Sequence, residues 1–245
     1  MSTSYIQKME RTQSSSFVGL WPLNEESGTV AYDISPNGYN GVSSGLLRSN
    51  LQRSFLAPDG DKCAQFDGSN SYINLYAAVT KEPTTIGSIS VWVAVPQANL
   101  AGTTTMQIIT LKYDASNYID ITFDGTAYQF NGAYDAAGTL VAVNSGLVYN
   151  VDGGVPAQWP EWHHFALTWT AAGDAVKFYA DGLQQGTTQS SLGVWTGAMA
   201  AATMVAGSSS SSSAADVLTG WMARLGIWSV VLTGDEVADL AVIGL

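Results

Sequence analysis

Short runs of β-branched and aromatic residues, separated by glycine-containing turns, recur along almost the whole chain and constrain its fold most strongly. The clearest runs are Phe17 to Leu23, Ser88 to Val95, Met106 to Lys112, Tyr118 to Phe123, Glu161 to Trp169 and Gly220 to Ser229. These runs do not alternate with long helical segments, as the strands of a parallel sheet would. The pattern therefore predicts an all-β fold, an antiparallel two-sheet β-sandwich of the jelly-roll type.

Local signals refine this picture. Ala175 to Gly186 reads as a hairpin with Asp181-Gly182 at its tip, because such a turn needs positive φ at both central positions. The stretch Thr233 to Glu236 has the pattern of a capping box, and it predicts a single short helix near the C-terminus. The six serines Ser208 to Ser213 are expected to form a loop between strands.

The length of 245 residues suits one large β domain. We expect residues 17–245 to form this domain and residues 1–16 to form a polar arm. The arm lacks the apolar core of a secretory signal. Two roles stay open for it, which are an assembly contact or anchor and simple packing along its own domain.

Charge and cysteine content exclude several classes of function. Nine Lys and Arg residues stand against twenty Asp and Glu residues, so the net charge is −11 and nucleic acid is an unsuitable partner. The single cysteine, Cys63, rules out an internal disulfide and a thiolate metal cluster. No run approaches the ~20 apolar residues that span a bilayer, so no membrane partner is expected.

Four motifs in the same order resemble laminin-G-like, concanavalin-A-like lectin domains. They are Val18 to Gly41 (VGLWPLNEESGTVAYDISPNGYNG), Cys63 to Gly68 with Tyr72-Ile73, Trp162 to Thr168 with Val176 to Gly182, and Gly220 to Leu240. The resemblance covers about Phe17 to Leu240. It implies the sandwich fold with a short helix after the closing strand.

The resemblance also implies a structural calcium, with Asp33, Asn37 and Asn40 as its ligands. The loop that carries them could supply several of the six to eight oxygens that this ion takes. The sequence departs from the family at Asn24, where the family has Asp, and at Ala223-Arg224, where it has an acidic pair. The alternative is that Asp33 and the two asparagines only form Asx turns.

Enzymatic activity is not expected. Related glucanases carry two glutamates in a strand motif E-x-D-x-x-E, and retaining hydrolysis needs two carboxyl groups ~5 Å apart. Here Asp120 matches the central acid, but Tyr118 and Phe123 stand at the two glutamate positions. Asp120 is then a solvent-facing or hydrogen-bonded strand residue. His163 and His164 are adjacent on a strand, so their side chains point to opposite faces and cannot share one ion.

Tryptophans supply the candidate contact residues. Five lie in predicted strands and are expected mostly in the core: Trp21, Trp92, Trp169, Trp221 and Trp228. Trp159 and Trp195 lie in loop-like stretches instead. Rings outside a core can stack on a sugar or contact a protein. They can also simply plug a loop.

Together these features predict a non-catalytic module that works by binding and assembly. The favoured setting is the surface of a virion, as a head decoration or fibre protein of a bacterial virus. Its partners there would be other structural proteins of the particle, including copies of itself, and a cell-surface glycan. The alternative is a free, extracellular or cell-surface carbohydrate-binding module of a polysaccharide-degrading or adhesion system, and a glucanase-like hydrolase ranks third.

Overall fold

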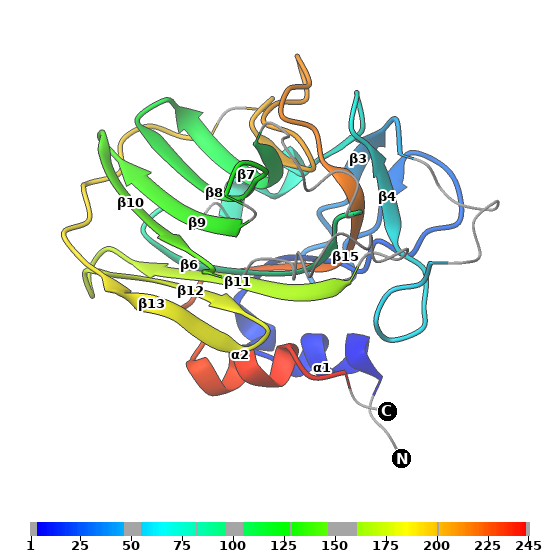
Figure 1. Cartoon of the computed structure of the whole chain (residues 1–245), viewed down its shortest axis with the longest axis horizontal. Coiled ribbons are helices and arrows are strands. Elements are labelled where there is room, and N and C mark those ends of the chain that lie inside the picture. Colours follow the sequence, from blue (N-terminus) through cyan, green and yellow to red (C-terminus); the bar gives the residue numbers. More distant parts are fainter. Residues whose placement is uncertain are drawn as a thin grey trace.

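The computed structural model describes residues 4–46, 55–81, 83–96, 105–127, 129–146, 161–199 and 201–243. Within these ranges two antiparallel sheets stack face to face, and two short α-helices cover the outside of one sheet (Figure 1). The predicted all-β jelly-roll sandwich with a short C-terminal helix is confirmed. None of the described helices is both long and apolar enough to cross a membrane.

The first sheet has seven strands, each antiparallel to its neighbours, and the closing strand β15 lies next to its edge. Its path runs β1 (Phe17–Trp21), β15 (Thr219–Trp228), β6 (Ile86–Ala94), β11 (Trp162–Thr170), β12 (Ala175–Ala180) and β13 (Leu183–Gln189), and β4 (Ala64–Asp67) also pairs with β15.

The second sheet has eight strands and lies across the core from the first. Its path runs β10 (Thr139–Asn144), β9 (Gln129–Ala136), β8 (Asn117–Asp124), β7 (Met106–Asp114), β14 (Met204–Ala206), β5 (Tyr72–Asn74), β3 (Gly41–Ser44) and β2 (Val30–Ala31). A 3₁₀ helix, η2 (Tyr76–Lys81), follows β5.

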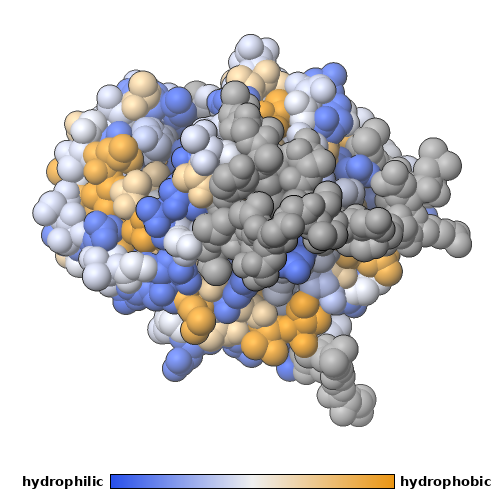
Figure 2. Space-filling view, viewed as in Figure 1, coloured by the Kyte–Doolittle hydropathy of each residue, from blue (hydrophilic) through white to orange (hydrophobic). Residues whose placement is uncertain are grey.

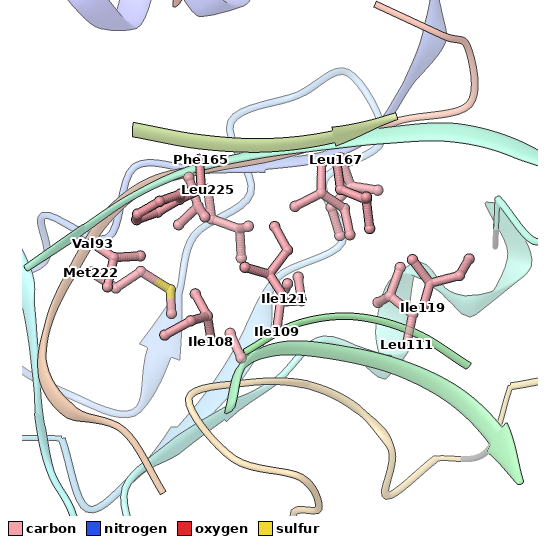
Figure 3. Packing of buried hydrophobic residues seen from close by; sticks show 14 of the residues in the cluster. Val93, Ile108, Ile109, Leu111, Ile119, Ile121, Phe165, Leu167, Met222 and Leu225 are labelled. Carbon is pink, nitrogen blue, oxygen red and sulfur yellow. The ribbon is translucent and has the colours of Figure 1, made fainter. Parts of the chain in front are cut away.

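The main core fills the space between the sheets (Figure 3). Alternate residues of β8 and β11 point into it, and Ile121 and Leu167 are fully buried there. The sheets approach so closely at Gly132 that a Cβ atom on this residue would lie 2.5 Å from the Phe178 ring. A larger residue at this position would therefore force the sheets apart.

A second apolar cluster seals the outside of the seven-stranded sheet. Helices α1 (Tyr5–Arg11) and α2 (Gly234–Leu240) lie side by side over this face in Figure 1. The buried residues of the cluster are Tyr5, Met9, Phe17, Leu20, Ala57, Cys63, Trp92, Ala166, Tyr179, Ala223, Trp228, Leu232, Val237 and Leu240. Because both helices are amphipathic and short, this packing supplies most of their stability.

Several local predictions are confirmed. The β12–β13 turn has positive φ at Asp181 (49°) and Gly182 (81°), as its sequence requires. The capping box at the start of α2 is present, since the Thr233 hydroxyl accepts from the N–H of Glu236 and the Glu236 side chain accepts from the N–H of Thr233.

The structure adds a second α-helix, which the sequence did not predict. Residues 4–16 contain α1 and a 3₁₀ turn, η1 (Ser14–Ser16). The helix begins with its own capping box, formed by Ser4 and Gln7, which sequence reading overlooked. Its residues Tyr5 and Met9 are buried against the domain's own sheet, so this segment packs along its own domain. An additional assembly role for residues 1–16 stays a prediction.

Candidate functional site

The outside of the eight-stranded sheet is polar, unlike the outside of the other sheet. On β8, Ile119, Ile121 and Phe123 are buried in the main core, so the alternate residues Tyr118 and Asp120 project outward with Thr122. We call the outward residues of β7, β8 and β9 the polar face: Gln107, Thr110, Lys112, Tyr118, Asp120, Thr122, Asn131, Ala133 and Asp135.

The strand register arranges the polar face as three short rows across three strands. Tyr118 lies opposite Lys112 on one side and Asp135 on the other. Asp120 occupies the centre, between Thr110 and Ala133 in the middle row. The third row is Gln107, Thr122 and Asn131. Directly opposed side chains lie about 5 Å apart at Cβ, so one ligand of modest size could touch all three rows.

Asp120 is only 8% exposed, and its environment changes its acidity. Burial raises the pKa of its carboxyl to about 7, although a hydrogen bond from Gln107 and the charge of Lys112 oppose the shift. The ammonium of Lys112 also lies 6.0 Å from the centre of the Tyr118 ring. The centre of the polar face therefore holds a carboxyl that is partly protonated, and able to donate a hydrogen bond, near neutral pH.

Asp135 is the second acid of the polar face and is 6% exposed. Burial raises the pKa of its carboxyl, and the charge of Asp114 acts in the same direction while a backbone N–H at Gly138 opposes it. Among the described residues, Asp135 Oδ1 is one of two buried side-chain polar atoms with no hydrogen-bond partner. A buried acceptor of this kind is costly to leave unpaired, which adds to the cost of ionising the carboxyl.

Chemically, the polar face offers hydroxyl, amide, carboxyl, ammonium and aromatic groups on rigid strands. Such a mixture suits a ligand that carries many hydroxyl or amide groups. Apolar residues reach the surface only in separate groups in the view of Figure 2, with polar residues between them.

The three predicted calcium ligands have other partners. The Asp33 carboxylate accepts four hydrogen bonds, from the N–H groups of Leu20, Ser35 and Tyr39 and from the Ser35 hydroxyl, at 2.7 to 2.9 Å. Four donors occupy the lone-pair sites of one carboxylate. The group therefore has no oxygen lone pair directed at an ion.

The two asparagines complete the same loop. Asn40 Oδ1 accepts from the N–H of Asp33 at 2.9 Å, and Asn37 Nδ2 donates to the carbonyl of Phe17 at 2.7 Å. Asn37 thus directs its nitrogen, which cannot ligate a cation, into the loop. These donors do not fit a calcium ion at this position, and the geometry is that of Asx turns.

His163 and His164 are adjacent on β11, and their rings have different partners, as expected for neighbouring strand residues. His163 Nδ1 lies 2.7 Å from Asp181 Oδ2, whereas the His164 ring is fully buried and its Nε2 lies 2.8 Å from the Ser90 hydroxyl. Burial lowers the pKa of His164 to about 3, although the charge of Asp181 opposes this. His164 is therefore neutral in the folded protein and acts as a packing residue.

The two loop tryptophans differ in what the structure describes. Trp195 is half-buried against the main core, with its ring 6.2 Å from that of Tyr134, and its Nε1 donates to the carbonyl of Gly197 at 3.1 Å. It plugs the end of its loop, and a ligand contact there stays a prediction. Trp159 lies outside the described residues. Of the five predicted core tryptophans, only Trp221 is half-buried rather than buried.

Sequence reading did not find the polar face. The signal was available in β8, where Tyr118, Asp120 and Thr122 alternate with three large apolar residues. It was weak in β9, because Gly132 and Ala133 interrupt the alternation on both sides of the strand. Asp135 could be assigned to the same face only once the register of β8 and β9 was known.

Comparison with known proteins supports the β-sandwich fold described above. A family model described as the concanavalin A-like lectin/glucanases superfamily matches residues 67–238. No curated protein matches the chain in sequence.

Several solved structures share the fold at low sequence identity. The botulinum neurotoxin serotype D binding domain has 12% identity and a TM-score of 0.63, and the match covers 93% of this chain and 52% of that one. The binding domain of Paraclostridial Mosquitocidal Protein 1 has 14% identity and a TM-score of 0.64, with 93% and 52% covered. The chain thus spans about half the length of these toxin domains.

A third similar structure has nearly the same length as this chain. Domain 4 of AbnA, a GH43 extracellular arabinanase from Geobacillus stearothermophilus solved in complex with arabinotriose, has 18% identity and a TM-score of 0.61. The match covers 93% of this chain and 98% of that domain. At such identities, these likenesses establish the fold and leave the ligand of this chain to its own residues.

Proposed function

Because this chain belongs to the concanavalin A-like lectin/glucanase superfamily, we propose that it is a non-catalytic binding module whose contact surface is the polar face. One observation carries the proposal. The outside of the seven-stranded sheet is sealed by α1 and α2, whereas the outward residues of β7, β8 and β9 carry hydrogen-bonding groups on half-buried side chains, with Thr110, Asp120 and Asp135 buried among them. The ligand class that fits these groups is a glycan.

Catalysis is not part of the proposal. Asp120 and Asp135 project from neighbouring strands on the same face, in adjacent rows, so they are diagonal neighbours on one surface. Glycoside hydrolysis needs its two carboxyl groups on either side of the scissile bond. Phe123, at the position of the second glucanase glutamate, is buried in the core. Hydrolysis of a β-glucan by the wild type that disappears in Asp120→Asn would contradict this proposal.

The binding proposal is tested by a glycan array followed by titration of the best ligand. We expect Tyr118→Ala to weaken binding roughly ten-fold, the effect of losing about 1.4 kcal/mol of contact energy. Gln184→Ala on the exposed strand β13 of the other sheet is the matched control and should bind as the wild type does. Equal binding by all three proteins would place the site elsewhere. Trp159→Ala and Trp195→Ala then tell whether the loop tryptophans carry it.

For the biological setting, we propose the surface of a virion, as a decoration or fibre protein of a bacterial virus. Two features support this. Cys63 is the single cysteine, so the chain has no internal disulfide, which suits a protein that folds in a reducing compartment. In addition, α1 and α2 lie together on one side of the sandwich and the polar face lies on the other, so one side could rest on a particle.

Imaging of intact particles tests this setting. Density for the sandwich on a particle, with the side of α1 and α2 toward the shell, would support it. A stable monomer that associates with no particle would contradict it. The alternative, a free carbohydrate-binding module of a polysaccharide-degrading or adhesion system, is favoured if the isolated chain binds a polysaccharide and no particle protein.

A further inference from the structure

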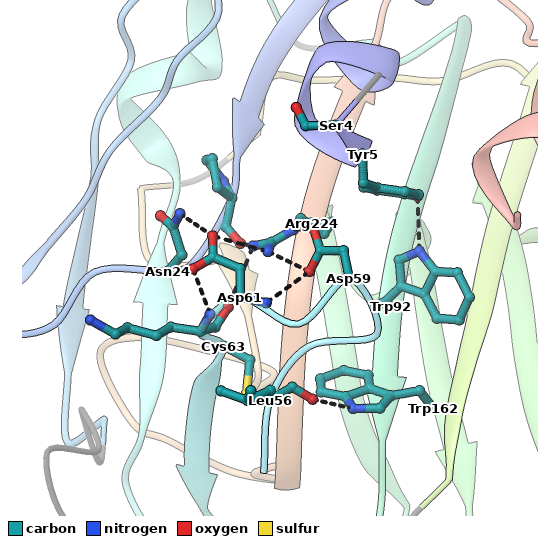
Figure 4. Close-up of polar contacts among 12 residues, drawn as sticks. Ser4, Tyr5, Asn24, Leu56, Asp59, Asp61, Cys63, Trp92, Trp162 and Arg224 are labelled. Atoms are coloured by element: carbon teal, nitrogen blue, oxygen red, sulfur yellow. Dashed lines mark hydrogen bonds and ion pairs between the residues drawn. The ribbon is translucent and has the colours of Figure 1, made fainter. Parts of the chain in front are cut away.

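A buried arginine lies at the centre of a shell of oxygen atoms beside the closing strand (Figure 4). The Arg224 side chain is 1% exposed. Its Nε and Nη2 donate to the two carboxylate oxygens of Asp59 at 2.9 and 2.7 Å, and Nη2 lies 3.2 Å from Asp61 Oδ2. Its Nη1 donates to the carbonyls of Pro22 at 2.8 Å and Lys62 at 3.4 Å. Five oxygens from four residues thus surround one cationic group.

The backbone of β15 is distorted at this point. The pairing of β15 with β6 shifts between Ala223 and Gly226, and Arg224 has a φ of 58°. A non-glycine residue keeps this left-handed conformation only where its surroundings enforce it. The ion pairs and hydrogen bonds between Arg224 and the oxygen shell stabilise this strained conformation.

The shell consists of two carboxylates and two backbone carbonyls, which are the ligands that a calcium ion takes in proteins. Burial tends to raise the pKa of Asp61, but hydrogen bonds from Asn24 and the Lys62 N–H and the charge of Arg224 bring it below its usual value. Asn24 Nδ2 holds Asp61 Oδ2 at 2.7 Å. Two negative charges therefore face one guanidinium, and a divalent ion would balance them fully.

The oxygen shell also holds the segment 55–63 against the second apolar cluster. Asp59 and Asp61 lie on the segment 55–63, and the Phe55 ring of this segment stacks on Trp162 at 5.4 Å. Phe55 also packs on Trp221, with ring centres 4.5 Å apart. The position of the segment thus depends on both the ion pair and the ring contacts.

We propose that the Arg224 guanidinium takes the place of a structural divalent cation, so that the fold is held at this point without a metal and a latent calcium site lies beneath the side chain. The shell holds five of the six to eight oxygens that a calcium ion takes, so water would complete the coordination once the guanidinium is removed.

The test removes the Arg224 guanidinium and leaves the oxygen atoms around it unchanged. Arg224→Gly removes the guanidinium, and glycine accepts a φ of 58° without strain. In chelator we expect this variant to melt roughly 6–20 °C below the wild type, since one partner of a buried pair is lost. Millimolar calcium should restore at least half of the difference, and isothermal titration should show one bound calcium. The wild type should melt at the same temperature in chelator and in calcium.

Three controls make the outcome decisive. The double variant Arg224→Gly/Asp59→Asn should lose the calcium response, because Asp59 supplies two of the five oxygens. Arg224→Lys keeps a charge without the planar fork, so it should be partly destabilised and insensitive to calcium. If Arg224→Gly does not fold in chelator, refolding in calcium is the same test.

A calcium response of the wild type, or none in Arg224→Gly, would overturn the proposal. So would a calcium response that persists in the double variant, since the ion would then bind elsewhere. Magnesium should not replace calcium, because it demands a more regular octahedral shell. These outcomes are independent of glycan binding, because the proposed glycan site lies on the opposite sheet.

Discussion

The outer faces of the two sheets serve different purposes in the same sandwich. On the seven-stranded sheet, outward residues such as Trp92 and Trp228 are covered by α1, α2 and the segment 55–63, which creates a second core. On the eight-stranded sheet, outward residues such as Tyr118 and Thr122 stay partly exposed. A sandwich needs one buried face per sheet to fold. The chain buries a third face with its terminal helices and carries half-buried polar side chains on the fourth.

The largest expected effect comes from opening the second core. Trp228 is fully buried, its ring lies 5.5 Å from that of Phe17, and its Nε1 donates to the carbonyl of Thr12 at 2.9 Å. Trp228→Ala should therefore lower the free energy of unfolding by about 3–5 kcal/mol, measured by urea denaturation. Thr122→Ala on the polar face is the control and should change it by less than about 0.5 kcal/mol. Similar losses in the two variants would mean that the faces do not differ as described.

The next effect concerns the acid at the centre of the polar face. Because burial raises the pKa of Asp120 to about 7, the folded state binds a proton more tightly than the unfolded state does. Stability from this group is present below pH 4 and is lost as the pH rises from about 4 to about 7. Asp120→Asn should remove this loss, so it should be about 2–4 kcal/mol more stable than the wild type at pH 8.

Thermal unfolding of both proteins across pH checks the prediction for Asp120→Asn. At pH 3.5 their stabilities should be nearly equal, because the carboxyl is protonated in both states of the wild type. An unchanged difference between pH 3.5 and pH 8 would contradict the raised pKa.

On the outer face of the seven-stranded sheet, which α1 and α2 cover and which we call the sealed face, His164 should give the opposite pH dependence. Burial lowers the pKa of His164 to about 3, so the unfolded state binds the proton more tightly. Stability from the neutral ring is present above pH 6.5 and is lost as the pH falls below that value toward 3. His164→Gln, which keeps a partner for Ser90, should lose about 2–3 kcal/mol less than the wild type between pH 6.5 and pH 4. If both proteins lose stability equally over this interval, the buried ring is not the acid-sensitive group.

Sequence patterns predicted those parts of the fold that depend on neighbouring residues. The strand runs, the Asp181-Gly182 turn and the capping box at Thr233 are local features, and the structure confirms each. The buried role of Trp169 also follows from strand alternation. For these features the chemistry of a few consecutive residues decides the conformation.

What the sequence did not predict depends on pairings between distant segments. The polar face requires the registers of β7, β8 and β9, and the oxygen shell of Arg224 joins residues that are 165 positions apart. Asp33 shows the reverse case, since its carboxylate could have been a metal ligand or part of an Asx turn, and its own loop supplies four hydrogen-bond donors to it. The residue types alone do not show which backbone N–H groups will donate to a carboxylate.

Helix α1 was missed for a related reason, and it gives the smallest of the expected effects. Seven residues cannot form a stable isolated helix, so its formation depends on contacts made far along the chain. The Tyr5 hydroxyl is the centre of those contacts, because it donates to the carbonyl of Leu240 in α2 and accepts from Trp92 Nε1 at 2.8 Å. One oxygen thereby joins both terminal helices to the sheet.

Tyr5→Phe should therefore cost about 1–3 kcal/mol, since it leaves a buried N–H and a buried carbonyl without this partner while keeping the ring. Tyr76→Phe, at a tyrosine that is 37% exposed, is the matched control and should be neutral. Hydrogen exchange adds a readout specific to the sealed face, because the amides of α2 should exchange faster in Tyr5→Phe while those of β8 should not. Equal acceleration at β8 would mean that the helices and both sheets unfold as one unit, and the sealed face would then have no separate stability.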